Sequence, residues 1–296
     1  MNRRPTILPY LLTLPSLLFV ALFTAWPTLL TLYQSFFRQR LNIARFRTPT
    51  FIGLDNYAAL LAGPDFREVL GNTLIYVVGT VPLSIALAFL LALLVNRRMR
   101  GIGFLRLAFF YPTVLPMVSA ATIWMFFFTP DYGLFNQSLR FLGYSGPENW
   151  TANPNLALLA VMIVALWKNA GYYMIFYLAG LQNLPTDVFE AAALDGANGW
   201  QQLIFITFPL LRRTTLFIST IATISAFQTV DHIFVLTNGG PSNASSLLLY
   251  WLWEVRFSFS NVGLAAAITV ILIAILLLFT VTNFVLSEGR ESADVA

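Results

Sequence analysis

Six long apolar runs, separated by more polar segments, constrain the fold of this chain more than any other feature of its sequence. Each run is long enough to cross the ~30 Å hydrocarbon layer of a bilayer as an α-helix, which takes about 20 residues. Only 10% of the 296 residues are charged and 58% are hydrophobic, whereas a soluble domain carries about 25% charged residues. The sequence therefore predicts an all-α, polytopic membrane protein in which residues 1–296 form a single transmembrane domain. Its six predicted spans cover about residues 8–33, 70–95, 107–128, 156–181, 209–235 and 262–286.

Prolines interrupt the first and third runs. The first run is too long for a secretory signal, contains Pro15 and Pro27, and has no convincing small-residue cleavage site, so we interpret it as an uncleaved anchor. In the third run, Pro112 and Pro116 remove two backbone donors from the helical ladder. We therefore expect a kink in the third span.

The residue types that carry common enzymatic and metal chemistry are scarce. The chain has no cysteine and one histidine, His232, which disfavours thiolate and paired-histidine metal sites. A phosphate-cradling loop needs a lysine after a glycine, whereas the one lysine, Lys168, follows Trp167. The net charge of +4 suits loops beside lipid headgroups better than a nucleic-acid surface. No span carries the paired carboxylates of a membrane-embedded enzyme, so we predict no catalytic residue, metal or cofactor in this chain.

A half-polar segment, from Glu190 to Pro209, lies between the fourth and fifth runs. The residues from Asp187 to Leu194 are rich in helix-forming alanine and leucine. Asp187 stands three residues before Glu190, which is the spacing of a helix start with a reciprocal cap. Ala191–Ala193 give this helix a slim surface that fits a groove of another protein. The pattern predicts a first short helix over residues 187–194.

Turn residues follow this first helix. Asp195 and Gly196 allow the chain to reverse, and Gly199 provides a second break. The pattern from Trp200 to Phe208 is amphipathic again. Pro209 suits the first turn of the next helix, where its missing N–H costs nothing. The segment is therefore predicted to be a short helix, a turn and a second short helix.

The same segment resembles a known family. Glu190-Ala191-Ala192, with Gly196 four positions after Ala192 and Ile206–Pro209 at the end, resembles the EAA loop of permease subunits in binding-protein-dependent ABC importers. The similarity extends to Tyr177–Gln182, Pro185, Asp195–Ala197 and Leu236–Pro241, the last of which is similar to the maltose-type carbohydrate branch. The resemblance implies that the loop, about residues 182–208, docks on a cytoplasmic ATPase subunit. The implied ATPase-coupling residues are Glu190, Ala191, Ala192, Asp195, Gly196 and Ala197.

The resemblance also implies a function and partners. It implies a permease that forms the pathway for a sugar, an oligosaccharide or glycerol 3-phosphate, and the residues do not separate these substrates. The implied partners are a second permease subunit in a heterodimer, two ATPase subunits that use ATP and Mg²⁺, and an extracytoplasmic solute-binding protein. The implied location is the cytoplasmic membrane of a bacterium or archaeon. The loop 129–155 is too short for the large periplasmic insertion of the maltose relative.

An ion-gradient-driven secondary transporter is the alternative function. Such proteins commonly show repeated halves and buried carboxylates that bind coupling ions. This sequence shows no convincing repeat, and its carboxylates cluster in loops, with Asp231 as the exception near the membrane. The alternative is therefore disfavoured.

Six spans place both termini on the same side of the membrane. With both ends inside, the inner segments hold nine arginines and the outer segments seven. The positive-inside rule thus favours cytoplasmic termini by a small margin, and the resemblance favours them because it requires the 182–208 loop to meet a cytoplasmic partner. The nine inner arginines are Arg3, Arg4, Arg97, Arg98, Arg100, Arg106, Arg212, Arg213 and Arg290.

Lys168 lies about midway along the fourth run, where an ionisable group is costly and marks a candidate for function. Asn169 and Tyr172 share a helical face beside it and offer hydrogen bonds and an aromatic surface to a sugar. The resemblance favours these two positions for substrate contact. We predict a substrate pathway that contains Lys168, Asn169, Tyr172 and, from the fifth run, Gln228. Two roles stay open for Lys168: contact with substrate, including a phosphate, or bonds to helix carbonyls that hold the bundle together.

Asp231, in the fifth run, is a tempting ion-pair partner for Lys168. Counted from the 182–208 loop, the two residues differ in depth by about 13 Å at ~1.5 Å per residue. An ion pair is therefore disfavoured unless a helix is tilted or broken. His232, the next residue, is expected to be an interfacial residue at the end of the span.

Overall fold

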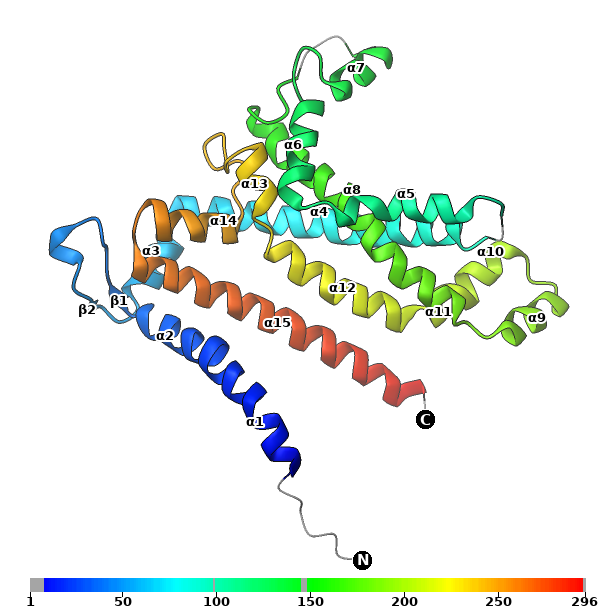
Figure 1. The fold of residues 1–296 in the computed structure, drawn as a ribbon, viewed down its shortest axis with the longest axis horizontal. Helices are drawn as coiled ribbons and strands as arrows, with labels where there is room; N and C mark the ends of the chain where they lie inside the picture. Colours follow the sequence, from blue (N-terminus) through cyan, green and yellow to red (C-terminus); the bar gives the residue numbers. More distant parts are fainter. Residues whose placement is uncertain (1–7, 98, 145–147, 295–296) are drawn as a thin grey trace, which may run out of the picture. The chain divides into compact units, whose positions relative to one another are not determined.

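The computed structural model describes residues 8–97, 99–144 and 148–294, and its regular structure is dominated by helices (Figure 1). Arg3, Arg4 and Arg98, three of the arginines counted as inner, lie outside the described residues. The described chain divides into two compact units. The first unit comprises the residues up to Phe66 together with Leu252–Ile275, and the second comprises Arg67–Trp251 together with the residues from Leu276 onward.

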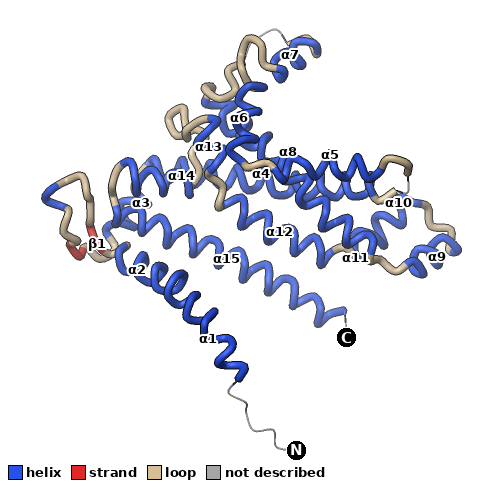
Figure 2. Tube along the Cα trace, in the orientation of Figure 1, coloured by secondary structure: helices blue, strands red, loops and turns tan. Residues whose placement is uncertain are grey.

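The elements follow one another with short connections, and the only strands among the described residues form one two-stranded pair (Figure 2). The helices and strands, in chain order, are α1 (Leu8–Val20), a π-helical stretch (Ala21–Ala25), α2 (Trp26–Gln34), β1 (Phe37–Arg38), a 3-10 turn (Ala44–Phe46), β2 (Thr50–Phe51), α3 (Asp55–Ala62), α4 (Pro64–Val95), α5 (Ile102–Val114), α6 (Met117–Phe127), α7 (Leu134–Phe141), α8 (Pro154–Gln182), α9 (Thr186–Leu194), α10 (Gly199–Gln202), a second π-helical stretch (Leu203–Thr207), α11 (Phe208–Leu210), α12 (Arg212–Phe227), α13 (Asp231–Leu236), α14 (Leu248–Trp253), a third π-helical stretch (Glu254–Ser258) and α15 (Val262–Asp294).

Within the described residues, four helical stretches are long and apolar enough to cross a membrane, or six if each of two bent pairs is counted as one span. The prediction of an all-α, polytopic membrane fold is thereby confirmed. The first stretch, Leu11–Gln34, exposes its apolar side chains along its whole length, as expected for a helix whose solvent is lipid. The other three are Pro64–Val95, Pro154–Gln182 and Val262–Asn283.

The third run consists of two helices that meet at a sharp bend. The axes of α5 and α6 meet at 102°, and the break falls between Val114 and Met117. Leu115 is extended because it precedes Pro116, whose ring disfavours the helical region for its neighbour. Pro112 lies inside α5, four positions before Pro116. The predicted kink is therefore confirmed.

The fifth run does not follow its predicted bounds of 209–235. The helical segment that begins at Gly199 continues to Leu210 and then bends by 63° into α12, which ends at Phe227. Residues 228–230 interrupt the run, and α13 begins at Asp231. An acidic residue in the first turn interacts favourably with the helix dipole, which suits a new helix start at this position.

In the first unit, the polar connection after α2 is held to the start of α15. The Asn56 side-chain amide donates hydrogen bonds to the carbonyls of Ser35 (2.8 Å) and Phe37 (3.0 Å). A Cβ on Gly263 would collide with the Phe37 carbonyl, so the close contact between the start of α15 and β1 requires glycine at this position. A single buried amide thus joins α3 to the chain that leads into β1.

In the second unit, small residues let α8 pack closely on its neighbours. Buried alanines and valines line its inner face, among them Ala160, Val161, Val164 and Ala165. At Gly171 a Cβ would collide with the backbone carbonyl of Phe109, so α5 and α8 touch backbone to backbone there. Such close approach through small residues is typical of helices packed within a membrane. It places α8 at the centre of the elements that build the candidate site.

Candidate functional site

The segment 183–211 joins α8 to α12 and begins with α9. The residue before α9 is Pro185, which makes no side-chain cap, and Asp187 is the second residue of the helix. The predicted reciprocal cap between Asp187 and Glu190 is therefore wrong, because both residues already lie inside the helix. Asp187 lies in the first turn of α9, where negative charge is favoured by the helix dipole, whereas Glu190 is in the middle of the helix.

The predicted reversal at Asp195 and Gly196 is confirmed, and it has the geometry of a Schellman motif. Gly196 has a φ of +84°, and its N–H donates to the Ala193 carbonyl (3.1 Å), while the Ala197 N–H donates to the Ala192 carbonyl (2.9 Å). A Cβ at Gly196 would meet nothing within 4 Å. The glycine is needed for its left-handed backbone and not for space.

A reciprocal cap does exist in this segment, at the second helix. The Asn198 side chain accepts from the Gln201 N–H (2.9 Å), and the Gln201 side chain accepts from the Asn198 N–H (2.8 Å). The second break thus falls at Asn198, and Gly199 is the first residue of α10. Pro209 lies in α11, within the same helical segment, and α12 starts after the bend, at Arg212. Pro209 therefore lies in the first turn of a helix, as predicted, but that helix is α11.

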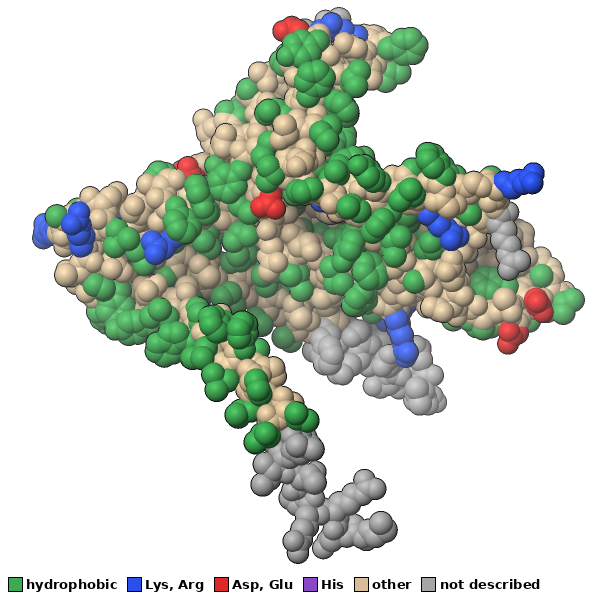
Figure 3. Space-filling view, in the orientation of Figure 1, with side chains coloured by type: hydrophobic (Ala, Val, Ile, Leu, Met, Phe, Trp, Pro, Cys, Tyr) green, Lys and Arg blue, Asp and Glu red, His purple; other side chains and the backbone are tan. Residues whose placement is uncertain are grey.

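The surface of segment 183–211 is largely exposed and carries apolar side chains. Leu194 is 90% exposed, Trp200 69% and Phe205 74%. The acidic side chains of α9, Asp187 and Glu190, are exposed as well, and Figure 3 shows red acidic side chains over this end of the second unit. Exposed apolar residues beside charged ones are typical of a surface that contacts another protein or a membrane.

A second place of interest is a cavity of about 200 Å³ at the breaks in the third and fifth runs. Its walls come from α4, α6, α8, the end of α12, the 228–230 break and α13. The residues that line it are Tyr76, Met117, Lys168, Asn169, Ser225, Gln228, Thr229, Val230, Asp231 and His232. Amide, hydroxyl and carboxylate groups converge here, which is the composition of a site for a hydroxyl-bearing ligand.

Three of the four predicted pathway residues lie on this cavity. Lys168, Asn169 and Gln228 line it, whereas Tyr172 is absent from its described lining, is 40% exposed, and packs its ring against Tyr173 (5.4 Å between centroids). Asn169 and Tyr172 share a helical face by spacing, but the cavity reaches only the first of them. Its further polar residues come from positions that sequence reasoning did not select.

Lys168 caps the end of α5. Its ammonium donates to the carbonyls of Pro112 (3.1 Å), Thr113 (3.2 Å) and Leu115. The Pro112 carbonyl would bond the N–H four residues later, but that residue is Pro116, which has none. Lys168 supplies the missing donor, and a cation is also favoured at the negative end of a helix. Of the two roles left open for Lys168, this geometry supports the binding of helix carbonyls.

Asp231 lies on the same cavity as Lys168. The depth difference calculated for continuous helices does not apply, because the fifth run is broken at residues 228–230 and α13 takes a new direction. His232 is 2% exposed, with Nε2 3.5 Å from the Tyr76 hydroxyl. The expectation that His232 is an interfacial residue is therefore wrong, since it packs inside the second unit.

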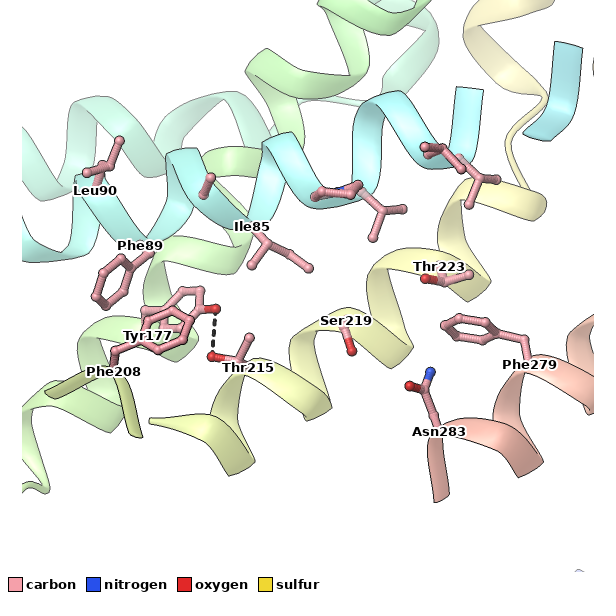
Figure 4. Close-up of a pocket in the computed structure, with 15 residues that line it drawn as sticks. Ile85, Phe89, Leu90, Tyr177, Phe208, Thr215, Ser219, Thr223, Phe279 and Asn283 are labelled. Carbon is pink, nitrogen blue, oxygen red and sulfur yellow. Dashed lines mark hydrogen bonds between the residues drawn. The ribbon is translucent and has the colours of Figure 1, made fainter. Parts of the chain in front are cut away.

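A larger cavity, of about 670 Å³, lies between α4, α8, α11, α12 and the distal part of α15 (Figure 4). Its lining is mostly apolar, with Ile85, Phe89 and Phe279 among the larger side chains. The Tyr177 hydroxyl donates to Thr215 Oγ1 (2.9 Å) at one edge. Because this lining is so apolar, it offers few hydrogen-bond partners to a carbohydrate. The smaller polar cavity is therefore the better candidate for a substrate pathway.

The arrangement as a whole defines a class of protein. Broken membrane helices surround a polar cavity, and an exposed helix–turn–helix segment directly connects two of the elements that line it, which is how a membrane-embedded transport subunit is built. Among the described residues, no group of three or more His, Cys, Asp or Glu side chains could hold a metal ion.

Comparison with known proteins assigns the family. Residues 81–288 match the family described as binding-protein-dependent transport system inner membrane component, and this chain belongs to that family. The sn-glycerol-3-phosphate transport system permease protein UgpA of Agrobacterium fabrum is 36% identical over 285 residues, which cover 96% of each chain. The trehalose/maltose transport system permease protein MalF of Thermococcus litoralis is 32% identical over 291 residues, covering 98% of this chain and 96% of the relative.

Solved structures show the same fold. A chain in the crystal structure of a bacterial ABC transporter involved in the import of the acidic polysaccharide alginate matches with a TM-score of 0.80, covering 95% of both chains at 21% identity. A second structure of a bacterial alginate ABC transporter, in complex with an alginate pentasaccharide-bound periplasmic protein, also gives 0.80. The chain is therefore a multi-pass inner-membrane permease of the ABC importer type.

Proposed function

We propose that this permease forms the pathway for a carbohydrate in an ATP-driven importer and that segment 183–211 couples it to the ATPase. The observation that carries the proposal is the exposed helix–Schellman turn–helix unit placed directly between α8 and α12. By its resemblance to the EAA loop, Glu190 makes a polar or ionic contact in an ATPase cleft and Gly196 sets the turn. The chain itself binds no nucleotide, and ATP and Mg²⁺ belong to two ATPase subunits.

Coupling follows from the short connection between this segment and the cavity. Only Asn183–Pro185 separate α8 from α9, and Lys168 lies 14 residues before Gln182 on one continuous helix, roughly 21 Å along its axis. A displacement of α9 by the ATPase pair therefore shifts α8, and with it Asn169, at the cavity. The bent start of α12 transmits the same displacement to Gln228. Alternation between outward-open and inward-open states is the expected result.

The cavity chemistry favours an uncharged carbohydrate over a polyol phosphate. The Lys168 ammonium has three N–H donors, and the carbonyls of α5 accept three hydrogen bonds from it. No donor is then left for a phosphate, and the exposed Asp231 carboxylate on the same cavity repels one. Asn169, Gln228 and Thr229 offer donors and acceptors to sugar hydroxyls instead. The relatives include permeases named for a sugar, trehalose/maltose, and for a polyol phosphate, sn-glycerol-3-phosphate.

The proposed assembly contains a second permease subunit, two ATPase subunits and an extracytoplasmic solute-binding protein. Both termini and segment 183–211 then face the cytoplasm of a bacterium or archaeon. To test this, the tagged chain is extracted gently from its native membrane and its companions are identified by mass spectrometry. Recovery of a P-loop ATPase and a second six-span permease supports the proposal. Recovery of the chain alone, active in ion-coupled uptake, contradicts it and favours a secondary transporter.

A further inference from the structure

A basic cavity of about 760 Å³ lies between the α4–α5 turn and the place where α8 leads into α9. The described residues that line it are Asn96, Arg97, Met99, Arg100, Ile102, Arg106, Leu181, Gln182, Leu184 and Thr186. Three of these carry guanidinium groups, and none of them carries a carboxylate. A cavity with this lining attracts an anion.

Arg106 is held in place by the helix that precedes it. Its Nε and one terminal nitrogen donate to the Val95 carbonyl (3.2 and 2.9 Å) at the end of α4. A guanidinium has five N–H donors, so others remain for a ligand. Arg97 and Arg100 extend from the exposed turn on the same cavity. Planar guanidinium groups suit the oxygen geometry of phosphate.

The position of the cavity points to the source of the phosphate. Helix α4 ends at Val95 and α5 begins at Ile102, so the cavity lies where membrane-spanning helices leave the hydrocarbon layer. Met99, which is 59% exposed, and Ile102 add apolar surface at its edge. This combination of apolar contact and positive charge at a span end fits a phospholipid headgroup with its acyl chains alongside.

The charges on α9 indicate that the ligand of the basic cavity differs from the protein that binds α9. Asp187 and Glu190 are acidic and exposed, so a protein surface that complements them is positively charged. Such a surface is repelled by Arg97, Arg100 and Arg106. The basic cavity and the surface of α9 therefore select binding partners of opposite charge.

We propose that this cavity binds the phosphate of an anionic phospholipid headgroup. Because the lining comes both from the α4–α5 turn and from residues 181–186, a bound headgroup links α4 and α5 to the start of segment 183–211. It thereby restrains the segment that couples the permease to its ATPase. The consequence for coupling rests on the proposed function, whereas the binding itself does not.

Lipid binding is measured on the purified full chain by native mass spectrometry, without ATPase or transport, so that failure of this inference is distinct from failure of the proposed function. Phosphatidylglycerol and phosphatidylcholine with the same acyl chains are titrated in detergent. R97Q/R100Q should bind phosphatidylglycerol roughly 25-fold more weakly, because each arginine near an anionic lipid contributes about fivefold. The control R45Q/R140Q removes the same charge from exposed arginines elsewhere and should bind as the wild type does.

Further variants and a competitor exclude simpler explanations. R97K/R100K keeps the charge and should retain most of the binding, which assigns the loss in R97Q/R100Q to the removed charge. Equal binding of phosphatidylglycerol and phosphatidylcholine by the wild type would overturn the proposal, as would equal loss in R97Q/R100Q and R45Q/R140Q. Displacement of phosphatidylglycerol by inorganic phosphate at comparable concentration would assign the cavity to a free anion and overturn the lipid source.

Discussion

Replacing Lys168 with methionine removes the donor that satisfies the carbonyls at the end of α5. The Pro112 carbonyl has no backbone alternative, because Pro116 occupies the position whose N–H would bond it. A carbonyl left unpaired away from bulk water costs about 1–3 kcal/mol, and Lys168 serves three of them. Water in the adjacent cavity offsets part of the loss, so we expect a destabilisation of roughly 2–4 kcal/mol.

The assay is thermal unfolding of the purified chain in detergent, followed by tryptophan fluorescence, together with substrate uptake in the assembled transporter. Lys168→Met should unfold several degrees below the wild type, and Lys168→Arg, which keeps a charge and several donors, should lie closer to it. Asn169→Leu is the matched control, because it alters the same cavity from the adjacent position and should lower uptake at unchanged stability. If Lys168→Met unfolds at the wild-type temperature yet loses uptake, Lys168 contacts the substrate and the capping explanation is wrong.

Four further substitutions test other contacts and turns of the structure. Gly171→Val places side-chain atoms against the α5 backbone and should cost about 1–3 kcal/mol, measured by thermal unfolding; wild-type stability would contradict the close contact. Gly196→Val strains a left-handed position by about 1–2 kcal/mol and should weaken ATPase co-purification while membrane insertion is retained. Glu190→Ala should leave the fold intact and uncouple ATP hydrolysis from uptake, and normal coupled uptake would speak against its contact role. Asn56→Ala removes two hydrogen bonds, about 1–3 kcal/mol in sum, and should increase proteolysis between α2 and α3; an unchanged digestion pattern would contradict that.

Features that depend on a single residue type were predictable from the sequence. Pro112 and Pro116 predicted a break in the third run, because proline removes donors wherever it stands in a helix. Gly196 predicted a reversal, because few other residues adopt a positive φ at low cost. The position of the reciprocal cap was not predictable from spacing, since Asp187–Glu190 and Asn198–Gln201 have the same spacing and only the second pair begins at an N-cap residue.

The break in the fifth run carries no such signal. Gln228, Thr229 and Val230 include neither glycine nor proline, and the polar residues at this point of the run do not by themselves specify a helix break. α13 packs against α6 in the structure, and this contact cannot be read from the sequence. For this reason Asp231 and His232 were misplaced, and the polar cavity that unites them with Lys168 became visible only in three dimensions.

In the proposed function, this permease moves its substrate by means of ATP hydrolysis in its ATPase subunits. The most direct measurement is uptake of labelled carbohydrate into proteoliposomes that contain this chain, its partner permease and its ATPase subunits, with the solute-binding protein added outside and ATP enclosed. We predict uptake that requires both ATP and the binding protein, is unaffected by collapse of ion gradients, and is lost in the Glu190→Ala variant. Uptake that proceeds without ATP and stops when the ion gradients collapse would contradict ATP-driven import.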